Sequence, residues 1–166
     1  FPTRRSSDLV ETTTNGTIVQ SAAHTIASQW QAVPHQIIYS EQMDQVVIVG
    51  TTFSGELTPY NYTTIDKSGF VLGLSLDRLN STSLFTLHTE TPGASTDNDM
   101  LENIVEVPNQ GYVMTGSANN PFTGSQNLHL MQIDYNGSPI YDDVYDVYGQ
   151  SNGTSVISNN LVGASV

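Results

Sequence analysis

The sequence predicts an all-β protein made of antiparallel four-stranded units that repeat head to tail. Three observations support this prediction. Short runs rich in β-branched and aromatic residues alternate with turns rich in Gly, Asn, Asp and Pro, which is typical of strands. Two stretches of the chain repeat each other. No stretch shows a sustained 3.6-residue apolar period with capping residues, as an amphipathic helix would.

The internal repeat is clearest in two pairs of apolar runs. Residues 46–51 (VVIVGT) recur as residues 112–117 (YVMTGS), with an offset of 66. Residues 71–77 recur as residues 128–134, with an offset of 57. A longer loop in the first copy accounts for the difference. The repeat therefore predicts two equivalent units.

Each unit is expected to contain four strands. In the first unit, the expected strands are residues 36–40, the runs ending in Gly50 and Asp77, and residues 84–88. In the second unit, they are residues 103–107, the runs ending in Gly116 and Asp134, and residues 140–145. In the first strands, the offset of 66 places Ile38 on Ile104. Residues 108–111 (PNQG) and 134–137 (DYNG) are expected to be turns, because Asn and Gly tolerate a positive φ.

A four-stranded unit of about 60 residues that recurs in order predicts the blades of a partial β-propeller. A β-sandwich is the alternative, since it needs a similar number of strands. The ordered recurrence favours the propeller, because the strands of a sandwich need not repeat. Residues 21–33 contain Ala and Ile at helical spacing, so a short helix is an alternative to a strand there.

The repeat divides the chain into five segments. Residues 1–9 (FPTRRSSDL) match the translation of a common sequencing adapter, so we expect a non-native scar there; a natural polar segment is the alternative. Residues 10–34 are the expected end of a preceding blade, 35–92 and 93–149 are two blades, and 150–166 start a further, truncated blade. We expect both ends of the chain to be cut.

The chain is strongly acidic. It has 166 residues and a formal charge of −12, and outside residues 1–9 only Lys67 and Arg78 are basic. Such a surface repels phosphate groups, which disfavours nucleic acids and anionic membranes as partners. There is no Cys, and Asn, Ser, Thr and Gly are abundant. This composition is typical of bacterial extracellular proteins, so we expect a secreted or cell-surface location.

Residues 99–149 carry the parts of a known type of repeat. Asp99 precedes an apolar strand, residues 110–117 read QGYVMTGS, residues 128–137 end in an Asp-x-x-Gly turn, and residues 145–149 read YDVYG. This pattern resembles the secreted β-propeller repeats common in Bacteroidota-type bacteria. The resemblance implies a propeller fold and an extracellular location, and it implies no particular activity.

The acidic clusters contain the candidate metal ligands. Asp97 and Asp99, within the sequence TDND, are candidate calcium ligands because alternate oxygen donors suit a hard cation. A solvated acidic surface is the alternative. Strand alternation places Asp142 and Asp146 on one face of the expected last strand. Calcium is the only cofactor that the sequence suggests.

No catalytic or cofactor-binding residue is predicted. The four histidines lack metal-ligand spacing. His129 is expected to point away from the face of Leu128 and Leu130, as a structural or surface residue. Tyr141 and Tyr145 are expected to pack between blades, and stacking on a sugar ring is the alternative.

Together these features predict an extracellular, non-enzymatic module for binding, adhesion or structure. Its expected partners are a glycan or protein at the cell surface and further blades of the same chain. The alternative function is the scaffold of a secreted glycan-active hydrolase whose catalytic residues lie outside this sequence. A third interpretation is a structural repeat that calcium stabilises.

Overall fold

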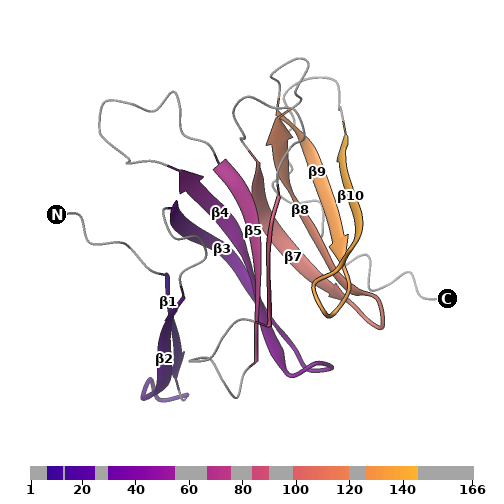
Figure 1. The fold of residues 1–166 in the computed structure, drawn as a ribbon. Helices are drawn as coiled ribbons and strands as arrows, with labels where there is room; N and C mark the ends of the chain where they lie inside the picture. The colour runs from indigo at the N-terminus through magenta and orange to yellow at the C-terminus, as the bar shows by residue number, and fades with distance from the viewer. Residues whose placement is uncertain are drawn as a thin grey trace, which may run out of the picture.

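The computed structural model describes residues 7–12, 14–24, 30–54, 67–75, 84–89, 99–119 and 126–145. These residues form ten strands and contain no helix (Figure 1). The strands are β1 (Ser7–Thr12), β2 (Ile18–His24), β3 (Trp30–Ser40), β4 (Gln45–Ser54), β5 (Lys67–Ser75), β6 (Phe85–His88), β7 (Met100–Val107), β8 (Gly111–Asn119), β9 (Gln126–Ile133) and β10 (Pro139–Tyr145). The predicted all-β class is confirmed for this part of the chain.

The strands form two four-stranded antiparallel sheets and one hairpin. The first sheet has the order β3-β4-β5-β6, the second has the order β7-β8-β9-β10, and β1 pairs with β2. In each large sheet, neighbours in the sequence are neighbours in space, so each is a simple meander. The two sheets lie side by side in Figure 1 and do not close into a ring.

The first strand of each large sheet starts earlier than the sequence predicts. Pairing in β3 begins at Trp30 and pairing in β7 begins at Met100. Both strands contain a β-bulge, between Pro34 and Gln36 in β3 and between Leu101 and Asn103 in β7. A bulge interrupts the side-chain alternation on which the prediction rested, and an edge strand tolerates Pro34 because its missing N–H is not needed by a neighbour.

The described part of residues 21–33 lies in the strands β2 and β3, so the alternative of a helix is wrong for those residues. Strand β1 begins at Ser7 and includes the last residues of the segment that matches the adapter. The predicted domain boundaries stay predictions.

Positive φ angles occur at a few turn residues of the described chain. Gly137, in the β9–β10 hairpin, has a φ of 84°, and Gly16, in the β1–β2 hairpin, has a φ of 83°. In the β9–β10 hairpin, Asp134 Oδ1 accepts the N–H groups of Asn136 and Ser138 and stabilises the turn. Asn109 follows β7 with a φ of 63°, as its place in the expected turn suggests.

The core between the two large sheets comes from one face of each. Val47, Val49 and Val71 point from the first sheet toward the second, and we call this the front face of the first sheet. The second sheet contributes the other buried residues of this cluster, which are Leu101, Ile104, Tyr112, Met114, Met131 and Ile133. The opposite, back face of the first sheet carries a second apolar cluster, formed by Val46, Ile48, Phe70, Leu72 and Leu74.

Strand pairing shows which residues of the two sheets are equivalent. Ile37 pairs with Ile48 in the first sheet, and Ile104 pairs with Met114 in the second. Ile48 and Met114 differ by 66, so Ile37 is equivalent to Ile104 at an offset of 67. The expected match of Ile38 with Ile104 is therefore wrong by one residue, because the turn after the first strand is one residue longer in the first sheet.

Unlike faces of the two sheets meet. Tyr112 and Met114 are equivalent to Val46 and Ile48, which lie on the back face of the first sheet. The second sheet therefore presents its back face to the front face of the first. The same relation repeated once more would place another sheet on the front face of the second.

Hydrogen bonds between the sheets follow this relation. Ser40 Oγ donates to Glu106 Oε1 at 2.7 Å, and their numbers differ by 66. Gln36 Oε1 accepts the Ile104 N–H at 2.7 Å, with a separation of 68. Gln45 Nε2 donates to the Tyr112 hydroxyl, with a separation of 67. The first sheet is thus held on the second with nearly equivalent positions facing each other.

Candidate functional site between the two sheets

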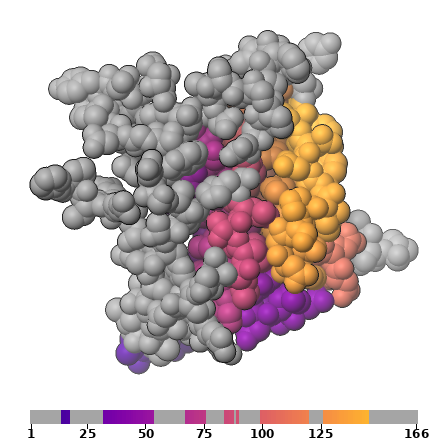
Figure 2. Space-filling view, viewed as in Figure 1, coloured from indigo at the N-terminus to yellow at the C-terminus, as the bar shows by residue number. Residues whose placement is uncertain are grey.

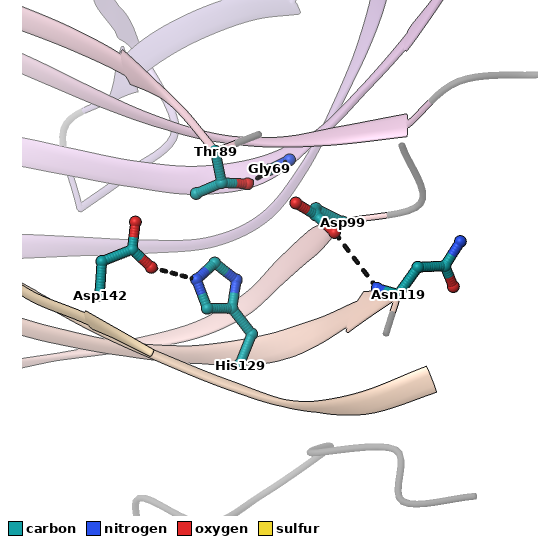
Figure 3. Close-up of polar contacts among 6 residues, drawn as sticks. All are labelled: Gly69, Thr89, Asp99, Asn119, His129 and Asp142. Atoms are coloured by element: carbon teal, nitrogen blue, oxygen red, sulfur yellow. Dashed lines mark hydrogen bonds and ion pairs between the residues drawn. The ribbon is translucent and has the colours of Figure 1, made fainter. Parts of the chain in front are cut away.

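Polar side chains occupy both ends of the interface between the sheets. At one end β3 and β7 finish and β4 and β8 begin, and we call this the turn end. At the opposite, far end lie Gly69, Thr89, Asp99, Asn119, His129 and Asp142, drawn in Figure 3. The far end holds buried ionisable groups, so it is the candidate functional site.

His129 and Asp142 form an ion pair or hydrogen bond across neighbouring strands. His129 Nε2 lies 2.6 Å from Asp142 Oδ1 (Figure 3). The His129 side chain is 3% exposed and that of Asp142 is 47% exposed. Burial alternates along β9, and His129 shares its buried face with Met131 and Ile133, away from Leu128 and Leu130 as predicted. It is a buried, paired residue.

Asp99 and Thr89 connect strand ends. The Asp99 N–H donates to the Lys67 carbonyl at 2.9 Å, and Asp99 Oδ1 accepts the Asn119 N–H at 3.3 Å. Thr89 Oγ1 accepts the Gly69 N–H at 3.0 Å. Asp99 is almost fully buried. Asp99, a candidate calcium ligand, therefore uses one carboxylate oxygen to bind the backbone of the last residue of β8.

The other predicted acidic residues are distributed differently. Asp97 and Asp146 lie outside the described residues. Within the described ranges, no group of three or more His, Cys, Asp or Glu side chains is arranged to hold a metal ion. Calcium at Asp97 and Asp99 stays a prediction.

On the two faces that meet, three buried polar atoms toward the far end have no hydrogen-bond partner among the described residues. They are Thr51 Oγ1, Asn127 Oδ1 and His129 Nδ1. Asn127 and His129 project from the same face of β9, and Thr51 projects from the front face of β4. A buried polar atom without a partner costs about 1–3 kcal/mol, and a bound water or polar ligand atom removes that cost. A hydrogen-bond partner for these atoms would therefore stabilise the fold.

The turn end differs in its electrostatics. Burial raises the pKa of the Tyr112 hydroxyl and the charge of Glu106 adds to the rise, while hydrogen bonds with Ser40 and Gln45 oppose it. Burial also raises the pKa of Tyr135, whose ring meets that of Tyr112 edge to face at 5.4 Å. The Tyr135 hydroxyl accepts the Asn109 N–H and donates to Gln42 Oε1. It therefore links the β7–β8 turn to the β3–β4 turn.

Sequence reasoning missed the pairing of His129 with Asp142. The two residues are equally far from the turn at 134–137, but the bulged register places Asp142 opposite Met131 and His129 opposite Val144, so the contact is diagonal. It also missed the burial of Asp99, which stands in an acidic stretch of the sequence.

No helix among the described residues is long and apolar enough to span a membrane. Comparison with protein family models, with curated proteins and with solved structures finds no match to this chain.

Proposed function

We propose that the two large sheets are neighbouring blades of a β-propeller-type array that serves as an extracellular, non-enzymatic module for binding or adhesion. The observation that carries this proposal is the meeting of unlike faces, with hydrogen bonds between residues 66–68 positions apart. Two halves of a sandwich related by a twofold axis bring like faces together, whereas units of an array bring front to back.

The β1–β2 hairpin fits the same arrangement. Its turn, with Asn15 followed by Gly16 at a φ of 83°, matches the turn between β9 and β10, with Asn136 followed by Gly137 at 84°. The hairpin would then supply the third and fourth strands of a preceding blade.

The charge and the burial of the ionisable pair support a binding role. A formal charge of −12 favours neutral glycans or basic proteins over anionic partners. The His129 side chain is only 3% exposed, so a substrate has little access to it in this conformation. We therefore place binding at the surface.

The outer strand β10 offers a surface for such binding. It lies exposed in the orange and yellow region of Figure 2. Tyr141 and Tyr145 project from one face of β10 with Asp143 between them, and Tyr145 is an exposed aromatic residue. An aromatic ring beside a carboxylate suits a sugar, because the ring stacks on its apolar face and the carboxylate accepts its hydroxyls.

A neutral-glycan array with a parallel assay for released sugar tests this function. We expect binding without turnover, and we expect Tyr145→Ala to weaken it at least tenfold. Val144→Ala is the matched control, because Val144 is also exposed and projects from the other face of β10. Release of sugar would support the hydrolase scaffold instead, and equal binding by both variants would contradict a site at Tyr145.

A further inference from the structure

The two tyrosines of β10 lie on one face of the strand at a fixed spacing. The pairing of β10 with β9 is regular from Tyr141 to Tyr145, because the bulge of this hairpin lies before Tyr141. Four residues of regular strand separate the two Cα atoms by about 13 Å, and side chains on one face of a strand stand roughly parallel. A single sugar ring is too small to contact both aromatic rings at this spacing, whereas a chain of linked sugars is long enough.

Exposure on this face of the second sheet increases from β8 to β10. Ser117 on β8 is 2% exposed, its β9 partner Leu128 is half-buried, and Tyr145, which pairs with Leu128, is 43% exposed. The next row of the sheet has the same order, from the fully buried Thr115 to the exposed Asp143. A bound chain would therefore lie along β10, because the face is already covered where it reaches β8.

Uncharged or acidic polar groups lie beside the two rings. The exposed carboxylate of Asp143 lies between them, and the half-buried amide of Gln132 is the cross-strand partner of Tyr141. A carboxylate accepts the hydroxyl groups of a sugar, and an amide both donates to them and accepts from them. Neither group attracts an anion, and the formal charge of −12 repels one. The chemistry of this strip therefore suits a neutral chain of sugars.

We propose that β10 binds an extended neutral oligosaccharide that lies along the strand, stacks on Tyr141 and Tyr145, and donates hydroxyl groups to Asp143. The inference rests on the proposed glycan-binding function and deepens it by naming the length and the direction of the ligand. A single sugar would contact one ring at a time. Because linked sugars engage the second ring at a high effective concentration, affinity should rise with chain length until both rings are covered.

Calorimetric titration of the full chain with neutral oligosaccharides of increasing length tests the proposal. The probes are cello-, manno- and xylo-oligosaccharides of one to six sugars, and the same lengths of any other neutral glycan that the array identifies. For the series that binds best, we expect the dissociation constant to fall at least tenfold between the single sugar and the hexasaccharide. A dissociation constant that does not depend on length overturns the proposal and leaves a site with one ring at Tyr145.

Variants separate a site with two rings from a site with one. Tyr141→Ala should weaken binding of the hexasaccharide at least tenfold and change binding of a single sugar much less, because one sugar can still stack on Tyr145. Tyr145→Ala should give the same pattern. Tyr141→Phe keeps the aromatic ring and should bind like the original chain. Val144→Ala is the matched control, because Val144 projects from the other face of β10, and it should bind every length unchanged.

The outcomes distinguish failure of the extended site from failure of the proposed function. Tyr141 is half-buried, so circular dichroism checks that Tyr141→Ala is folded; Tyr141→Leu replaces it otherwise, because Leu keeps apolar bulk without a ring. Full affinity for the hexasaccharide in either folded variant overturns the extended site and leaves glycan binding at Tyr145 in place. A chain that binds no neutral glycan of any length refutes both.

Discussion

The two ends of the interface between the sheets differ in how their polar groups are satisfied. At the turn end Ser40 is bonded to Glu106 and Gln45 to Tyr112, each across the interface. At the far end Thr51, Asn127 and His129 each bury a polar atom that has no partner among the residues that the structure describes. A fully paired set of polar groups fixes the position of one sheet on the other, whereas unpaired groups weaken the fold unless something binds them. The turn end therefore determines how the sheets stack, and the far end is where a ligand or water has most to contribute.

The largest expected effect tests how tightly the turn end is packed. Gly137→Ala should lower the free energy of unfolding by about 3 kcal/mol. Its φ of 84° is unfavourable for Ala, and an added Cβ would lie 2.5 Å from Cγ of Phe85 on the first sheet. Urea unfolding measures the change.

Gly16→Ala is the matched control for that substitution. Gly16 has almost the same φ, and nothing lies within 4 Å of an added Cβ. It should lower the free energy of unfolding by only about 1 kcal/mol. Equal losses of unfolding free energy in the two variants would mean that the β9–β10 turn does not pack tightly against Phe85. The turn end would then not determine how the sheets are positioned.

The next effect belongs to the far end. Asp142→Ala should cost about 2 kcal/mol of stability, because the buried His129 ring would lose the one hydrogen-bond partner that it has among the described residues. Asp143→Ala removes an exposed carboxylate from the adjacent position and should change stability by less than about 0.5 kcal/mol. Thermal unfolding of both variants in the same buffer compares them. Matching melting temperatures would show that the His129–Asp142 contact contributes nothing to the fold.

Much of the fold follows from local sequence patterns, and most of the candidate site does not. The β9–β10 hairpin was predictable because Asp134 and Gly137 have chemical roles that a turn requires. The start of β3 was not, because the bulge beside Pro34 breaks the alternation of side chains. Asp99 looked like a solvated acid because its partner, the Asn119 N–H, is 20 residues away and meets it only when β7 pairs with β8. The His129–Asp142 pair likewise depends on the register of a bulged hairpin.

The pH dependence of stability tests the contribution of Tyr112 at the turn end. The pKa of Tyr112 is raised in the folded state, so the folded protein keeps its proton at a pH where the unfolded chain loses it. Stability should therefore be constant below the unfolded-state pKa of about 10 and fall as the pH rises through the folded pKa. Tyr112→Phe should cost about 1 kcal/mol at neutral pH through the lost bond with Gln45, and its stability should fall less steeply above pH 10. Urea unfolding from pH 7 to pH 11 measures both effects, and an unchanged slope in the variant would mean that Tyr112 does not titrate with unfolding.

The smallest expected effect tests whether a water or a ligand binds at the far end of the interface. Thr51 and Thr52 are adjacent and fully buried, but Thr52 Oγ1 donates to the Ser68 carbonyl at 3.1 Å and Thr51 Oγ1 has no partner. Replacing each with Val keeps the shape and removes the hydroxyl. Thr52→Val should lower the free energy of unfolding by about 1 kcal/mol, whereas Thr51→Val should leave it unchanged or raise it by up to about 1 kcal/mol. A loss of stability in Thr51→Val as large as that in Thr52→Val would mean that the Thr51 hydroxyl has a partner in solution. A buried water would give that loss in every buffer, and a ligand would give it only where the ligand is present, so repeating the pair after exhaustive dialysis separates the two.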